Sequence, residues 1–258
     1  MRHFLILKNR PSYTFLKKSL IALQFLTILP IKIKSDIKEE DFGGSLIFFP
    51  LVGLIIGLVL TLINLLSGFL PSMVSGVIIL TANVIISGAI HLDGFADTCD
   101  GLYGNKNKEQ ALQVMRDSHS GAIAVIGVAL LLFFKFALLS SIPQENLGKL
   151  LIFMLVFSRY SQVFACFLSK YAREEETAKY FVEYATAREF TITTIFTLLL
   201  SALIMKISGI ILFSLCLFSV LLLIIWIKRK IGGMTGDTIG AVSEVAEVLA
   251  LFFALFLR

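Results

Sequence analysis

The sequence predicts an all-α protein that crosses a membrane several times. Of its 258 residues, 57% are hydrophobic, and the mean hydropathy is +0.88. The apolar residues form blocks of about 18 to 22 residues with almost no charge, and a helix needs about this length to cross the hydrocarbon layer. A soluble helical protein of this size would carry charged stripes along the same segments, and they are absent.

The blocks predict about seven transmembrane helices in one membrane-embedded domain, residues 1–258. Ahead of them, residues 1–43 are expected to form a cytoplasmic or interfacial segment with a membrane-associated helix. That segment begins like a signal peptide, but no small-residue cleavage site follows, so we expect it to be retained. The predicted spans lie at about 44–66, 69–90, 120–142, 149–168, 188–205, 208–227 and 237–258.

Lysine and arginine are distributed unequally between the two sides of this topology. Segments 1–43, 91–119, 169–188 and 228–236 share one side if all seven spans are real, and they hold 18 of the 23 basic residues. Because basic loops remain in the cytoplasm, this side is predicted to face the cytoplasm from the inner membrane. The net charge of +5 suits a phospholipid bilayer as partner and gives no reason to expect nucleic acid.

Close helix packing is indicated within the first predicted span. Gly53 and Gly57 are four residues apart, so they lie on one face of a helix. Small residues with this spacing allow two helix backbones to approach each other closely. We interpret this pair as a packing feature.

Carboxylates concentrate in the stretch His91-Leu-Asp-Gly-Phe-Ala-Asp-Thr-Cys-Asp-Gly, directly after an apolar block. Asp93, Asp97 and Asp100 are spaced i, i+4 and i+7, so they share one helix face. Three neighbouring carboxylates repel one another unless a cation neutralises them. Oxygen ligands suit magnesium or manganese. We therefore predict a metal site in a catalytic cytoplasmic loop, 91–119, in preference to a solvated acidic helix end.

A second motif, Met115-Arg-Asp-Ser-His-Ser-Gly, precedes the next block. Arg116 could clamp a phosphate with its planar guanidinium, or it could reach lipid headgroups instead. Asp117 could complete the metal site or cap the helix that begins here.

A third motif begins with a glycine-rich turn at Gly232 and Gly233, which leads into an apolar helix. Backbone amides of such a turn could hold an anion. On the helix that follows, Asp237, Glu244 and Glu247 share one face.

Buried carboxylates in a membrane helix need a partner, because an isolated charge in hydrocarbon is costly. A metal ion could be that partner for Glu244 and Glu247. Lys135 and Arg159, which fall inside other predicted spans, could serve instead.

Acidic metal sites beside phosphate-binding groups are typical of phosphoryl or nucleotidyl transfer. Residues 91–102 closely resemble the signature H-L-D-G-L-A-D-T-x-D-G-L of the cobalamin synthase family, also called adenosylcobinamide-GDP ribazoletransferase. The resemblance covers nearly the whole chain, and one departure is Ile28, where the family often has Arg. The further matching segments, in the family's order, are 25–30, 49–53, 115–118, 171–175 and 232–240.

The resemblance implies a transferase of phosphorus-containing groups that completes the nucleotide loop of vitamin B12. The 5′-hydroxyl of α-ribazole, or of its 5′-phosphate, attacks the cobinamide-linked phosphate of adenosylcobinamide-GDP. GMP leaves, and adenosylcobalamin or its 5′-phosphate forms. Mg²⁺ is the implied cofactor. Both substrates are implied partners, and a homo-oligomer and other B12-assembly enzymes are further candidates.

The resemblance also implies roles for individual residues, with Asp93 the first metal ligand. The metal-ligand candidates are Asp93, Asp97, Asp100, Asp117, Asp237, Glu244 and Glu247. The catalytic candidates are Asp93, Asp97, Asp117, His91 and Arg116. The substrate-binding candidates are Arg116, Arg173, Arg159, Gly232, Gly233 and Thr235.

Two other classes of membrane protein are compatible with acids at membrane boundaries. A CDP-alcohol phosphotransferase has an Arg after the alanine of its motif, where Asp97 stands here. A transporter of corrinoids or cations should carry its acids mid-span on several helices, whereas most acids here lie at predicted cytoplasmic ends.

Overall fold

The computed structural model describes residues 11–257 apart from 34, 105, 118 and 174–175. In this part of the chain all regular structure is helical, which confirms the predicted fold class. The elements in chain order are α2 (Pro11–Leu26), α3 (Glu39–Ser45), the short 3₁₀ helix η1 (Leu46–Phe48), α4 (Phe49–Ser67), α5 (Ser72–Ser87), α6 (Ile90–Leu102), α7 (Lys108–Val114), α8 (Ala122–Ser141), α9 (Gln144–Leu168), α10 (Ala178–Glu183), α11 (Ala187–Ile231) and α12 (Gly236–Ala254).

Four helical segments of the described chain are long and apolar enough to cross a membrane: Glu39–Ser67, which contains α4, then α8, α9 and α11. A fifth span is added if α5 and α6, which meet at a bend of 90°, count as one broken span. Each of the seven predicted spans is helical over most of its length. How many of these seven helical segments cross the membrane stays a prediction.

The 45-residue helix α11 consists of two arms that fold back on each other. The backbone at Lys206 is non-helical, with φ of 55° and ψ of −136°. Beyond it, Gly209 packs so tightly on the carbonyl of Ser201 that a side-chain carbon would overlap it. Residues eight apart in a continuous helix would be separated by about 12 Å. The predicted boundary between spans 188–205 and 208–227 is therefore confirmed.

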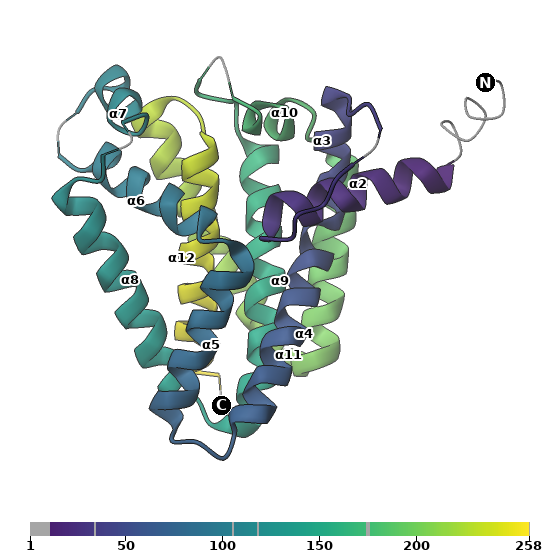
Figure 1. Cartoon of the computed structure of the whole chain (residues 1–258), viewed down its shortest axis with the longest axis vertical. Helices are drawn as coiled ribbons and strands as arrows, with labels where there is room; N and C mark the ends of the chain where they lie inside the picture. Colours follow the sequence, from purple (N-terminus) through teal and green to yellow (C-terminus); the bar gives the residue numbers. More distant parts are fainter. Residues whose placement is uncertain (1–10, 34, 105, 118, 174–175, 258) are drawn as a thin grey trace.

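The basic segments gather at one end of the helix bundle, which we call the head (Figure 1). The head comprises α2, α3, α6, α7, α10 and the turn between α11 and α12. The opposite end holds the α4–α5 and α8–α9 turns and the C-terminus (Figure 1). For the described residues, the predicted grouping of the four basic segments on one side is thus confirmed, whereas residues 1–10 of the first segment lie outside the described part of the chain. The side of the membrane on which the head lies stays a prediction.

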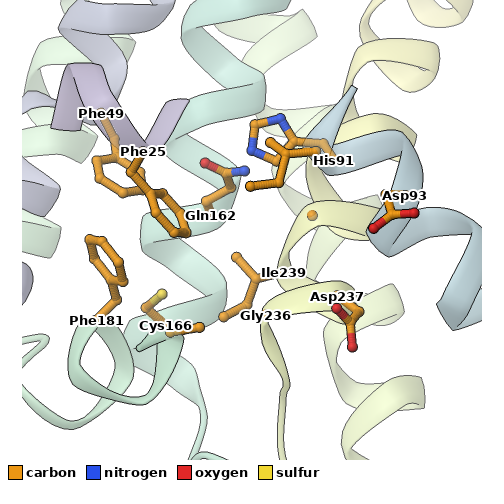
Figure 2. A pocket seen from close by; sticks show the side chains of 13 residues that line it. Phe25, Phe49, His91, Asp93, Gln162, Cys166, Phe181, Gly236, Asp237 and Ile239 are labelled. Atoms are coloured by element: carbon orange, nitrogen blue, oxygen red, sulfur yellow. The ribbon is translucent and has the colours of Figure 1, made fainter. Parts of the chain in front are cut away.

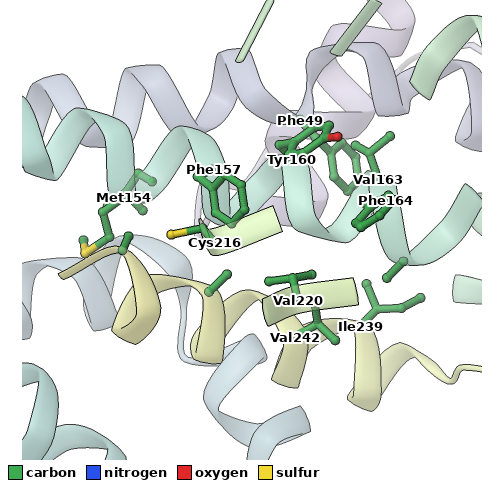
Figure 3. Close-up of a cluster of buried hydrophobic side chains, with 14 of the residues drawn as sticks. Phe49, Met154, Phe157, Tyr160, Val163, Phe164, Cys216, Val220, Ile239 and Val242 are labelled. Atoms are coloured by element: carbon green, nitrogen blue, oxygen red, sulfur yellow. The ribbon is translucent and has the colours of Figure 1, made fainter. Parts of the chain in front are cut away.

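Helix α9 forms the centre of the bundle, and 89% of its most apolar window is buried. Its aromatic side chains stack along one side, as in the pairs Phe153–Phe157 and Tyr160–Phe164, with ring centroids 5.7 and 6.2 Å apart. These rings pack against both arms of α11, at Phe190 and Phe213. The same buried cluster includes Ile239 and Val242 of α12 (Figure 3). The core therefore fixes α12 against α9, which matters for the site described below.

Helix α4 approaches α9 at the two glycines that the sequence singled out. A side-chain carbon on Gly57 would lie 2.8 Å from the Cα of Ile152, and one on Gly53 would overlap the carbonyl of Leu155. The predicted packing role of both glycines is confirmed.

Replacing Gly53 by alanine should lower the stability of the folded protein by about 1–3 kcal/mol, because the added methyl group meets rigid backbone. Gly68→Ala is the matched control, since its new carbon would come closest to the flexible end of Gln144, at 3.1 Å, and would lie at ordinary contact distance, 3.5 Å, from the backbone carbonyls of Asn64 and Leu65. Thermal unfolding in detergent measures both. Equal midpoints for the two variants would contradict the packing role.

Candidate active site at the head

Helix α6 carries the acidic motif, and a sharp bend turns it across the head (Figure 1). Gly88 and Ala89 both have left-handed backbones, with φ of 64° and 58°. Such a conformation is unfavourable for alanine, so the surrounding packing must hold it in place. The bend aims the acids of α6 toward the start of α12.

Helices α6 and α12 meet at a glycine. A side-chain carbon on Gly94 would lie 2.8 Å from the Cα of Asp237, so only glycine allows this approach. The contact brings Asp93 and Asp97, on either side of Gly94, next to Asp237 in the first turn of α12. We call these three carboxylates, together with Arg173, the acidic mouth.

The electrostatics of the acidic mouth favour a cation. Burial raises the pKa of Asp97 to about 6, and the neighbouring carboxylates of Asp237 and Asp93 add to this effect. A raised carboxyl pKa means that negative charge is disfavoured there. A bound cation would relieve the repulsion.

Arg173 contributes the positive charge of the acidic mouth. Its guanidinium lies 2.5 Å from Glu176 and 2.9 Å from Asp237. The Arg173 loop is tied to the start of α12 by backbone hydrogen bonds from Ala172 to the Met234 carbonyl and from Met234 to the Lys170 carbonyl, of 2.8 and 2.9 Å. Of the predicted substrate-binding arginines, Arg173 is the one that the described structure places at the mouth.

A cavity of about 170 Å³ opens beside the acidic mouth (Figure 2). Asp93 and Asp237 lie at its rim, and its interior is largely apolar. The lining residues are Phe25, Phe49, Ile90, His91, Asp93, Gln162, Cys166, Ala178, Phe181, Gly236, Asp237, Ile239 and Gly240. Two carboxylates thus border a small, largely apolar pocket, and an apolar lining with a few polar groups is the character expected of a small-molecule site.

Asp100 has a structural role at the start of α8. Its two carboxylate oxygens accept hydrogen bonds from the backbone amides of Gly121 and Ala124, of 2.5 and 2.9 Å. Asp100 therefore caps α8 from a different helix and satisfies amides that lack partners within α8. It was predicted as a metal ligand, and its carboxylate is directed to α8.

Arg116 and Asp117 are exposed on the connection between α7 and α8. Asp117 is bonded to the His119 ring at 2.7 Å, and this hydrogen bond lowers its pKa. No described contact links either residue to the acidic mouth. Their predicted roles in metal and phosphate binding find no support in this arrangement.

Glu244 and Glu247 lie in the bundle, away from the acidic mouth, and a cation from another helix pairs with them. The Lys135 ammonium is 2.5 Å from Glu244 and 2.6 Å from Glu247. Asn83 donates to Glu247 at 2.9 Å, and Arg159 lies 3.8 Å from the same carboxylate. All five side chains are buried. Of the two partners that the sequence offered, a metal or the basic residues, the structure contains the basic residues.

The glycine turn uses the Gly232 amide within the fold. Gly232 has a left-handed backbone with φ of 77° and donates to the carbonyl of Lys228, as a helix C-cap. Gly233 packs against the carbonyl of Lys170. Thr235 caps α12, since its side chain accepts from the amide of Thr238 at 3.2 Å. These three predicted substrate-binding residues shape the turn that positions Asp237.

Comparison with known proteins shows the family of this chain. Residues 18–255 match the family described as Cobalamin-5-phosphate synthase. The chain belongs to this family. A relative from Geotalea daltonii, named adenosylcobinamide-GDP ribazoletransferase, is 39% identical over 232 residues, covering 90% of this chain and 94% of the relative. No solved structure matches the chain.

Further relatives carry the same name. The protein from Acetivibrio thermocellus is 36% identical and covers 94% of this chain and 99% of its own length. The protein from Clostridium acetobutylicum is 35% identical, with coverages of 95% and 99%. The family resemblance read from the motifs is thereby confirmed.

The predicted set of seven metal ligands does not come together as one group. Within the described residues no three histidine, cysteine or acidic side chains are arranged to hold a metal ion. Magnesium, however, is commonly held by one or two carboxylates together with substrate phosphates and water. Asp93 and Asp97, which are crowded carboxylates at an open mouth, fit that mode.

Residues to which the sequence assigned no role complete the site. Phe25, Phe181 and Gln162 line the cavity from three separate helices. Phe25 begins the family-like segment 25–30, but Phe181 and Gln162 are ordinary side chains that no local pattern marks. A polar glutamine inside the predicted span 149–168 was the one available signal.

Replacing Asp100 by alanine should lower stability by about 0.5–2 kcal/mol, because the first turn of α8 loses its cap. The matched control is Glu109→Ala, an exposed acid of the head, with an expected change within about 0.5 kcal/mol. Thermal unfolding in detergent measures both variants. A stability unchanged by Asp100→Ala would contradict the capping role.

Lys135→Met should be more damaging, because it leaves two carboxylates buried without their cation. The expected loss of stability is about 3–5 kcal/mol. Lys149→Met, at an exposed lysine, is the control and should unfold near the wild-type temperature. If both variants unfold alike, the buried ionic cluster does not support the bundle.

Proposed function

We propose that this chain joins adenosylcobinamide-GDP to α-ribazole, or to its 5′-phosphate, and that the acidic mouth is its active site. The family and the names of its relatives support the reaction. The observation that supports the location is the convergence of Asp93, Asp97, Asp237 and Arg173 beside a cavity at one end of the bundle.

In the proposed reaction, the 5′-hydroxyl oxygen of α-ribazole bonds to the phosphorus that carries the cobinamide. The bond from this phosphorus to the bridging oxygen breaks, and GMP leaves with that oxygen. The nucleophile loses one proton. The protein therefore has to bind a diphosphate, orient a hydroxyl group and accept a proton.

Arg173 is suited to binding the diphosphate. Its two terminal nitrogens pair with two acids, Glu176 and Asp237, which fixes the direction of the guanidinium at the mouth. A planar guanidinium can bind phosphate oxygens through two parallel hydrogen bonds. Arg116, exposed on the α7–α8 connection, has no such support in the described structure.

Asp237 is our candidate for the group that accepts the proton. It lies at the rim of the cavity, where a bound hydroxyl group would meet it, and it begins α12. A side-chain acid–base group typically contributes a factor of about 10² to 10⁴ to the rate. His91, another predicted catalytic candidate, also lines the cavity but is buried, whereas Asp237 is partly exposed.

Asp93 and Asp97 would hold Mg²⁺ together with the substrate. The ion would offset the negative charge of the diphosphate and of the leaving phosphate. This assignment is supported by the raised pKa of Asp97 and by the oxygen-only character of the mouth.

The head is proposed to face the cytoplasm from the inner membrane. Its four segments contain 18 of the 23 basic residues, and basic loops remain on the cytoplasmic side. The family match favours this function over a CDP-alcohol phosphotransferase. The ion pairs of Lys135 with Glu244 and Glu247 speak against a transporter, because these acids inside the bundle are already paired with a basic residue.

Purified protein in lipid with Mg²⁺ should convert the two substrates to a cobalamin and GMP. Asp237→Asn should lower kcat by about 10²- to 10⁴-fold. Asp93→Ala should abolish turnover or raise the Mg²⁺ concentration that it requires. Glu109→Gln, at an exposed acid of the same end, should retain wild-type kcat.

Product formation by chromatography, with folding checked by thermal unfolding, measures these effects. Absence of product from wild-type protein would overturn the function. Normal turnover in a folded Asp93→Ala or Asp237→Asn variant would remove that residue from the site.

A further inference from the structure

Three phenylalanines form one wall of the cavity beside the acidic mouth (Figure 2). Phe25 comes from α2, Phe49 from α4 and Phe181 from α10. The ring centroids are 4.5 Å apart for Phe25–Phe181, 5.5 Å for Phe49–Phe181 and 6.2 Å for Phe25–Phe49. We call these three rings the aromatic wall. It offers an apolar, aromatic contact surface for a flat ligand.

Two buried polar side chains face the same cavity and lack partners. His91 is 3% exposed, and neither of its ring nitrogens has a hydrogen-bond partner in the described structure. Gln162 is 1% exposed, and its side-chain carbonyl oxygen is likewise unpartnered. Figure 2 shows the Gln162 amide between Phe25 and His91. Unpaired buried polar groups cost about 1–3 kcal/mol each, so these two indicate a ligand or water that completes them.

The chemistry of the lining restricts the ligand. An aromatic wall suits a flat, mostly apolar ring system. The imidazole N–H of His91 and the amide NH₂ group of Gln162 can each donate a hydrogen bond to a ring nitrogen, whereas the unpartnered Gln162 oxygen can only accept one and needs a separate donor such as water. A ring with several polar edges, such as guanine, would leave some of its groups unpaired against this wall. A benzimidazole that is attached to ribose has one free ring nitrogen, which accepts one hydrogen bond.

We propose that this cavity binds the benzimidazole ring of α-ribazole, with its free ring nitrogen toward Gln162 and His91. The proposal rests on the proposed function and adds the location of one substrate to it. With the base in the cavity, its ribose extends to the rim, where Asp93 and Asp237 lie. The 5′-hydroxyl group is thereby directed to the acidic mouth.

The leading test variant is Gln162→Met, which removes the carboxamide but keeps a side chain of similar length. Gln162 is on α9, apart from the acids of α6 and α12, so the acidic mouth stays intact. Loss of the hydrogen bond should raise KM for α-ribazole roughly tenfold. KM for adenosylcobinamide-GDP should not change. Phe181→Leu, which removes one ring of the aromatic wall, should act in the same direction.

Asn64→Leu is the matched control. Asn64 is also a buried carboxamide, 1% exposed and with an unpartnered oxygen, but it lies near the far end of α4. Its replacement should leave both KM values unchanged. Thermal unfolding of all three variants identifies any effect that comes from loss of folding.

A binding measurement without turnover separates this proposal from the function itself. α-Ribazole binding to magnesium-free wild-type protein in lipid is followed by equilibrium dialysis. Free 5,6-dimethylbenzimidazole should compete, guanosine should not, and Gln162→Met should weaken binding roughly tenfold.

The outcomes are distinguishable. Wild-type protein that forms no product refutes the proposed function. If wild-type protein is active but folded Gln162→Met binds α-ribazole normally, the cavity is not the benzimidazole site. Equal competition by guanosine, or a higher KM for adenosylcobinamide-GDP alone, would assign the cavity to the guanine nucleotide and overturn the proposal.

Discussion

The pairing of Lys135 with Glu244 and Glu247 is the interaction on which the arrangement of the bundle depends. It places two carboxylates and an ammonium group inside a helix bundle, away from solvent. Charges in such surroundings are tolerated only when each has its partner. Because Lys135 is on α8 and both acids are on α12, the pairing fixes the position of α12 relative to α8. Arg159 and Asn83 extend the same constraint to α9 and α5.

The position of α12 in turn determines the geometry of the head. Its first turn carries Asp237, and its contact with Gly94 sets the distance between that carboxylate and the acids of α6. The bend at Ala89 then gives α6 its direction across the bundle. A rigid ionic and aromatic core thus supports a site that is itself crowded with negative charge. A rigid core beneath a strained site is expected where function requires local electrostatic repulsion, because the rest of the fold must supply the stability that the site lacks.

Much of the fold could be predicted because hydropathy and basic residues report directly on membrane spans and sides. The reversal at Lys206 could be predicted as the boundary between two apolar blocks. The basic residues that pair with Glu244 could be predicted as possible partners, since buried acids must have partners. The site was less predictable. Helical spacing put Asp100 beside Asp93 and Asp97. The sequence does not reveal, however, that the amides at the start of α8 bind one of these three similar carboxylates, Asp100. The cavity wall is assembled from separate helices, so it has no signature in any one segment.

The same ionic cluster has a consequence for biosynthesis. Lys135 leaves the ribosome 109 residues before Glu244 and 112 residues before Glu247. While the intervening helices are being made, α8 must therefore hold an uncompensated cation at or within the bilayer. Helix α12, with its own acids, is too polar to be among the four segments able to cross a membrane by length and composition. Helix α12 thus depends on the earlier helices for its insertion and is needed to neutralise Lys135, so the bundle closes as a unit only after α12 has been made.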